Sequence, residues 1–129
     1  MTKKEFELKI KQKYPILYKN LHNKTTSSSG YILPIVFGVD CGEGWYDLIE
    51  YASAKLEGLH QGIEMVQIKE KFAQLRIYVN NHTDEVEKIL GFVENESSTT
   101  CEMCGAKGEI FVDQGWWKTR CDKCKTKKW

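Results

Sequence analysis

The sequence of 129 residues has the length of one domain of ordinary size, with or without a small appendage. Its 41% apolar and 29% charged residues are typical of a folded globular chain, and they exclude a disordered or membrane-embedded protein. A formal net charge of +1 argues against a protein that coats nucleic acid, and the lack of any secretory signal or long apolar run predicts a cytoplasmic protein.

The N-terminal third begins with an amphipathic segment. Apolar residues recur at helical spacing from Phe6 to Leu21, and Pro15 within this run favours two short helices or one kinked helix. Residues 23–30 are rich in Ser and Thr and predict a loop. The β-branched and aromatic residues from Ile35 to Val39 predict a buried strand.

The middle of the chain predicts two more helices around a hairpin. Apolar residues from Trp45 to Leu56 share one helical face, and Gly58 is expected to end this helix. Two strands follow over residues 65–79, connected near residues 71–74. Thr83 then caps a third helix with an acidic first turn, which ends before residues 97–100.

These elements together predict an α+β fold. We expect a body over residues 1–100 with a small antiparallel sheet and about three helices, followed over residues 101–129 by a zinc-ribbon-like module packed onto it as one domain. Within the module, residues 109–112 and 116–119 predict a hairpin.

The cysteines give the most specific signal in the sequence. Four of them form two Cys-x-x-Cys turns separated by sixteen residues, Cys101 with Cys104 and Cys121 with Cys124. Zinc binds four thiolates in a tetrahedron, and this spacing is typical of a zinc ribbon. We therefore predict one Zn²⁺ ion per chain. Four protein ligands leave no position for water, which indicates a structural ion.

Two other chemistries remain as alternatives for these cysteines. A redox dithiol needs only one Cys-x-x-Cys pair and would leave the second pair unexplained. An iron–sulfur cluster is chemically compatible with four thiolates, but its ligands usually follow a tighter spacing.

Three separated motifs carry a resemblance to a family. They are Asp40–Ile49 (DCGEGWYDLI), Ile68–Val79 (IKEKFAQLRIYV), and Cys101–Gly105 (CEMCG) with Gly115–Trp116 and Thr119–Asp122. In this order they resemble a group of small uncharacterised proteins encoded by phages and prophages. The resemblance implies a phage or mobile-element context, hence the host cytoplasm, but no activity.

The chain departs from that family pattern at a few positions. The family often has paired glycines at Ala73-Gln74, an aspartate at Glu43, and a Cys-x-x-His where this chain has Cys121 and Cys124.

A ligand site is a further expectation. Gly42-Glu43-Gly44 before a helix leaves backbone N–H groups that can hold an anion. Trp45 and Asp47 follow this turn, and Lys69, Lys71 and Arg76 of the hairpin supply positive charge. A nucleotide or phosphate pocket of these residues competes with a plainer account. In that account Trp45 is core, the lysines are solvated, and Asp40 and Asp47 are caps or partners of Arg76.

Catalysis has little support in the sequence. His22, His60 and His82 are isolated along the chain, and Cys41 is a candidate nucleophile that more simply serves as a small buried thiol. We expect a protein that is not an enzyme.

Three function classes therefore stay open. The first is a non-enzymatic zinc-binding accessory protein of phage type that recognises a host protein or a small anionic signal and blunts a host defence. The second is a zinc-ribbon nucleic-acid binder that uses Trp116, Trp117, Trp129 and the C-terminal lysines. The third is an enzyme of unseen mechanism. The acidic segment, with twelve Asp or Glu against five Lys or Arg in residues 25–100, favours the first.

Overall fold

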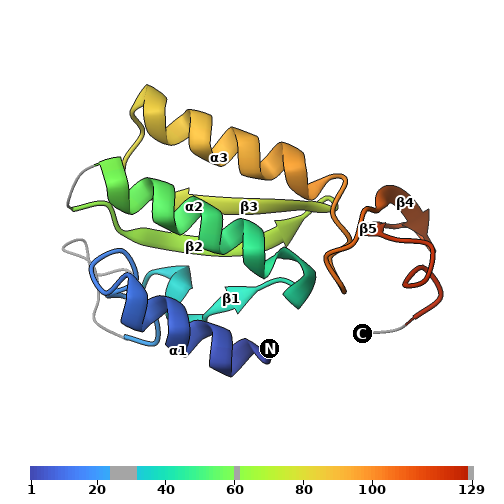
Figure 1. Ribbon diagram of the computed structural model, residues 1–129, viewed down its shortest axis with the longest axis horizontal. Helices are drawn as coiled ribbons and strands as arrows, with labels where there is room; N and C mark the ends of the chain where they lie inside the picture. The colour runs from blue at the N-terminus through green and yellow to red at the C-terminus, as the bar shows by residue number, and fades with distance from the viewer. Residues whose placement is uncertain (24–31, 60–61, 128–129) are drawn as a thin grey trace.

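A computed structural model describes residues 1–23, 32–59 and 62–127 (Figure 1). The described elements are α1 (Lys3–Lys13), η1 (Pro34–Phe37), β1 (Val39–Asp40), η2 (Glu43–Trp45), α2 (Tyr46–Leu59), β2 (Met65–Lys71), β3 (Gln74–Val79), α3 (Asp84–Ser97), β4 (Glu109–Asp113) and β5 (Trp116–Arg120). The predicted loop beyond Asn23, together with His60 and Trp129, lies outside the described residues.

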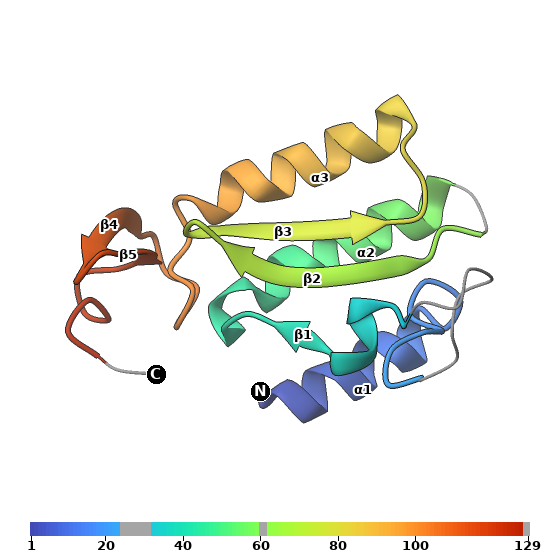
Figure 2. The same ribbon diagram turned by 180° about the vertical axis from the view of Figure 1, so that it is seen from behind.

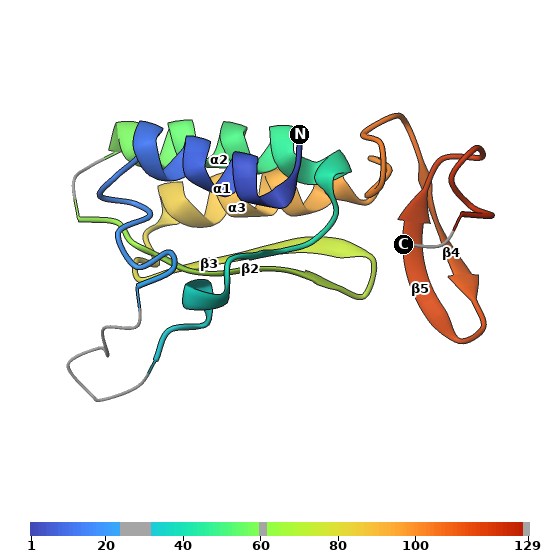
Figure 3. The ribbon, with the colours of Figure 1, turned by 90° about the horizontal axis from the view of Figure 1, so that it is seen from below.

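The body has two layers, a sheet and the three α-helices that lie on one side of it (Figure 3). The strand order is β1-β2-β3, in which β1 runs parallel to β2 and β2 runs antiparallel to β3. The predicted α+β class is confirmed. The sheet is mixed because α2 carries the chain from β1 back across the sheet before β2 begins, and such a crossover makes neighbouring strands parallel.

The first helix ends where the sequence predicts a break. Thr2 caps α1, and the helix stops at Lys13, since Pro15 lacks the N–H that would continue it. The expected second helical piece is a series of turns over residues 15–22. Leu17 and Leu21 still enter the core from these turns.

The strand predicted from Ile35 to Val39 is wrong for most of its length. Pro34–Phe37 forms the 3₁₀ turn η1, and the ring of Phe37 is 77% exposed. Gly38 follows with a φ of +92°, and the N–H of Val39 donates to a buried carboxylate oxygen of Glu7 at 2.6 Å. A side chain at Gly38 would collide with that carboxylate. The path of this segment is therefore set by its hydrogen bond to Glu7 of α1 rather than by its local β propensity.

The remaining elements of the body follow the sequence pattern closely. Four residues of the predicted apolar face of the second helix are fully buried: Trp45, Ile49, Ala52 and Leu56. This helix, α2, extends to Leu59, one residue past the predicted stop at Gly58. The hydroxyl of Thr83 accepts from the N–H of Val86 at 3.4 Å, which confirms the predicted cap of α3.

The C-terminal hairpin of β4 and β5, here called the ribbon, lies beyond one end of the body. Figures 1 and 2 show it beside the turn between β2 and β3. Its register pairs Glu109 with Arg120 and Asp113 with Trp116. Among the described helices, none is long and apolar enough to cross a bilayer.

Candidate metal centre and adjoining groove

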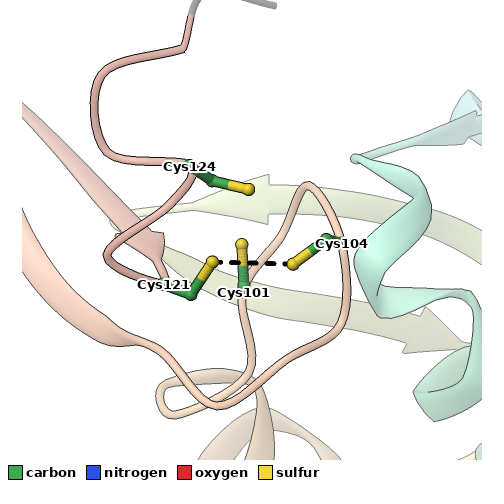
Figure 4. A group of neighbouring side chains, drawn as sticks. All are labelled: Cys101, Cys104, Cys121 and Cys124. Carbon is green, nitrogen blue, oxygen red and sulfur yellow. Dashed lines mark hydrogen bonds between the residues drawn. The ribbon is translucent and has the colours of Figure 1, made fainter.

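The four cysteines of the two Cys-x-x-Cys turns meet at one point. Their sulfur atoms lie within 4.8 Å of one another, and the Sγ atoms of Cys104 and Cys121 are 3.6 Å apart (Figure 4). All four are free thiols; Cys101 and Cys124 are buried, and Cys104 is exposed. Within the described ranges, no other group of three or more Cys, His, Asp or Glu residues approaches this closely.

The backbone around these sulfurs favours thiolates. Burial disfavours the thiolate of Cys101, but three backbone N–H groups aimed at its sulfur outweigh burial and lower the pKa of Cys101 to about 6. Burial and the three neighbouring thiols raise the pKa of Cys124 to about 12. The first proton of the cluster therefore leaves readily, whereas full ionisation requires a cation at the centre.

Zinc suits this donor set best. Four sulfurs at about 2.3 Å from a tetrahedral Zn²⁺ ion lie about 3.8 Å apart, close to the spacing seen here. A thiolate-only set of this size is a soft-metal site rather than one for Mg²⁺ or Ca²⁺. The four cysteines thus form a metal site, as the sequence predicts.

Comparison of the chain with protein-family models, with curated proteins and with solved structures gives no match. The phage-family resemblance therefore stays a prediction from the three motifs.

The first Cys-x-x-Cys turn is held directly against the body. The N–H of Gly44 donates to the carbonyl oxygen of Glu102 at 2.8 Å, and the N–H of Gly42 donates to its carboxylate at 2.9 Å. The indole N–H of Trp45 donates to the carbonyl oxygen of Thr100 at 2.7 Å. A Cβ atom on Gly44 would lie 2.0 Å from the carbonyl oxygen of Cys101, so only glycine fits between the two segments.

These contacts correct the predicted anion site. Both N–H groups are taken by Glu102: that of Gly42 donates to its side-chain carboxyl group, and that of Gly44 donates to its backbone carbonyl oxygen. Trp45 is fully buried, so its ring cannot stack on a ligand. Burial raises the pKa of Glu102 to about 7, in spite of the hydrogen bond from Gly42. Sequence reasoning missed Glu102, because only the fold brings it to a turn sixty residues earlier.

The other residues of the predicted ligand site do not converge on one pocket. Lys69 and Arg76 are opposite each other in the register of β2 and β3, and Lys71 shares their face of the sheet. Asp47 is exposed on α2, which covers the opposite face of the sheet.

Arg76 has a different partner from the aspartates considered for it. Its guanidinium forms an ion pair with Glu94 of α3 and also donates to Gln74 at 3.1 Å. The pairing with Asp40 or Asp47 is therefore wrong, and the positive charge of Arg76 is already matched within the body.

A groove opens instead between the ribbon and the turn of the β2–β3 hairpin. Its volume is about 850 Å³. Three aromatic rings and three charged groups line it: Phe72, Trp116, Trp117, Glu70, Glu102 and Lys118. The rings are largely solvent-exposed, at 67% for Phe72, 73% for Trp116 and 55% for Trp117. Sequence reasoning named the two tryptophans only as a secondary candidate and missed Phe72 and Glu70.

The turn that carries Phe72 is tight although it contains no glycine. Phe72 and Ala73 have φ angles of 50° and 68°, left-handed values that are rare for a bulky side chain. Two contacts hold Ala73: its N–H donates to Glu70 at 2.8 Å, and its carbonyl oxygen accepts from the hydroxyl of Thr119 at 2.6 Å. The ribbon thus fixes the turn, and the turn presents the Phe72 ring to the groove.

The remaining chemically reactive candidates lie apart from both sites or are protected. His22 pairs with Glu7 at 3.0 Å, and His82 pairs with Glu87 at 3.4 Å. Cys41 packs against the core, where burial and nearby carboxylates raise its pKa. A thiol in this state is protonated at neutral pH and a poor nucleophile.

Proposed function

We propose that this chain is a non-enzymatic binding protein whose ribbon is held by one structural Zn²⁺ ion, and whose binding surface is the groove beside it. The four-sulfur cluster carries the proposal. It closes the coordination sphere of a metal at the point where the ribbon joins the body, so the ion positions one wall of the groove. The raised pKa of Cys41 supports a role without covalent catalysis.

The exposure of the groove supports a binding role. Large exposed aromatic surface is unusual in a soluble monomer and marks interaction sites. A bulky residue held in the left-handed region costs on the order of 1–2 kcal/mol, and such strain is retained mainly where function requires the geometry. Phe72 combines both features.

The nature of the partner follows from the charges. The N–H groups of Gly42 and Gly44, which the sequence offers to a small anion, contact Glu102 instead, and this favours a protein partner over an anionic signal. We therefore favour recognition of a protein by this accessory protein. In a phage or prophage setting, which the three motifs indicate, that partner is a host protein.

Nucleic-acid binding is the second candidate, since Trp116 and Trp117 could stack on bases. Its electrostatic support is weak. Lys118 pairs with Asp113 at 3.0 Å, and Lys125 pairs with both Glu109 and Asp122. Part of the positive charge of these two lysines is therefore offset within the chain. Affinity for oligonucleotides that falls steeply with salt would favour this candidate.

Metal analysis of two variants tests the proposal. The unchanged protein is expected to hold one zinc ion per chain, and Cys104→Ser is expected to lose it and become sensitive to proteolysis near residue 100. Cys41→Ala is the matched control and should keep its zinc, because Cys41 lies outside the cluster. A protein without zinc, or a Cys104→Ser variant that retains zinc and protease resistance, would overturn the proposal.

A further inference from the structure

We infer that the groove binds a positively charged side chain, lysine or arginine, from a partner protein. The inference rests on the proposed function, because the ribbon supplies two of the three rings. The inference adds the chemical class of the ligand, about which the zinc site gives no information.

The aromatic walls provide the first argument. Phe72 stands on the hairpin turn and Trp116 and Trp117 on β5, so rings approach the groove from both modules. The face of an aromatic ring carries negative charge density and attracts a cation within about 6 Å of its centre. Walls of this kind enclose ammonium and guanidinium groups in proteins that bind modified or basic peptides.

The charges of the lining provide the second argument. Glu70 and Glu102 are carboxylates, whereas the ammonium group of Lys118 is already paired with Asp113 at 3.0 Å. Glu70 is the lining carboxylate that lies outside the metal-ligand turn, so the attraction for a cation depends on its charge. The ammonium group of Lys71 already lies 5.9 Å from the centre of the Phe72 ring, so the two tryptophans and Glu70 carry the preference for a cation over a phosphate.

Carboxylates also line the surface next to the groove. A second hollow shares Glu70 and Glu102 with the groove and adds one further carboxylate, Asp40, and one lysine, Lys3. A peptide with a basic residue in the groove and another beside it would meet carboxylates at both places. Steering by this acidic surface raises the rate of encounter with a basic partner.

Titration of the zinc-loaded protein tests the inference. Short glycine peptides with one central lysine, trimethyl-lysine, arginine, norleucine or glutamate serve as probes, and NMR follows the indole N–H signals of the tryptophans. We expect saturable shifts of Trp116 and Trp117 with the cationic probes only. Trp45 is an internal control, since its indole N–H is bound to Thr100.

Variants assign the effect to named groups. Trp117→Ala should weaken binding of the cationic probes about two- to thirtyfold, the range of a cation–π contact. Glu70→Gln should weaken it by up to about fivefold. Phe37→Ala removes an equally exposed ring from η1, away from the groove, and should change nothing.

Three other results would refute the cationic ligand without refuting the zinc-held ribbon. Equal binding of norleucine, or no shift with any probe, would refute the cationic ligand and leave the zinc-held ribbon intact. Preference for a short oligothymidine over the peptides would refute it in favour of nucleic acid. Normal zinc content and protease resistance in the same sample show that the zinc-held ribbon of the proposed function has not failed.

Discussion

Replacement of Gly44 by alanine is the sharpest test of how the metal module is attached. The added methyl group would lie 2.0 Å from the carbonyl oxygen of Cys101, 2.6 Å from the nitrogen of Gly105 and 2.7 Å from the carbonyl carbon of Glu102. All three are backbone atoms of the ligand-bearing turn, so no side chain can rotate away. The turn must move off the body.

That movement breaks the hydrogen bonds that join the two parts. They run from Gly44 to Glu102, from Gly42 to Glu102 and from Trp45 to Thr100. A neutral hydrogen bond contributes about 1 kcal/mol net, and one to a carboxylate about 1.5–3 kcal/mol. We therefore expect Gly44→Ala to lower the free energy of unfolding by about 3–5 kcal/mol, a large fraction of the ~5–15 kcal/mol typical of a domain.

Urea unfolding followed by far-UV circular dichroism measures this loss. Gly58→Ala and Gly91→Ala are matched controls in α2 and α3, where an added methyl group meets no atom within 4 Å. Both should raise stability by up to about 1 kcal/mol, because alanine is the better helix former. A Gly44→Ala protein as stable as the unchanged one, with the Trp45 indole still protected from exchange, would refute the assigned contact.

Three further predictions concern strain, reactivity and pH. Phe72→Gly should be more stable than Phe72→Ala by about 1 kcal/mol, since φ of 50° suits glycine, and equal melting temperatures would contradict the strain. Cys41 in the zinc-loaded protein should react with a thiol reagent far more slowly than in the unfolded chain, because burial raises its pKa. Equal rates in the two states would contradict the protection of this thiol. Burial raises the pKa of Tyr18, and it raises that of Tyr46 from 10.0 to about 12. The unfolded chain ionises first, so stability should be complete below pH 10 and fall as the pH rises through 12; a level unfolding free energy there would exclude this.

Features set by neighbouring residues were predictable from the sequence. The Cys-x-x-Cys turns, the cap at Thr83 and both hairpins depend on residues close together in the chain, so pattern and spacing locate them. The metal site is of this kind, because each pair of ligands comes from one turn and the spacing between the turns fits a hairpin.

Features set by long-range contacts were not predictable. The segment from Ile35 to Val39 has strand propensity, yet the buried carboxylate of Glu7 determines its path. The turn at Gly42 looks like an anion site, and only the folded chain shows Glu102 occupying it. The groove likewise joins residues that are more than forty positions apart, so no local pattern signals it.

Closure of the ribbon by one metal centre, together with the proposed binding role, couples metal retention to occupancy of the groove. A ligand that touches both Phe72 and Trp117 binds only while the ribbon is docked, so by mass action it opposes the release of the ion. At a ligand concentration a hundredfold above Kd, this coupling adds about 2.7 kcal/mol to the stability of the loaded state. Reciprocally, we expect a chelator that removes the ion to inhibit binding without touching the groove, and we expect a bound partner to protect the protein from chelation and proteolysis.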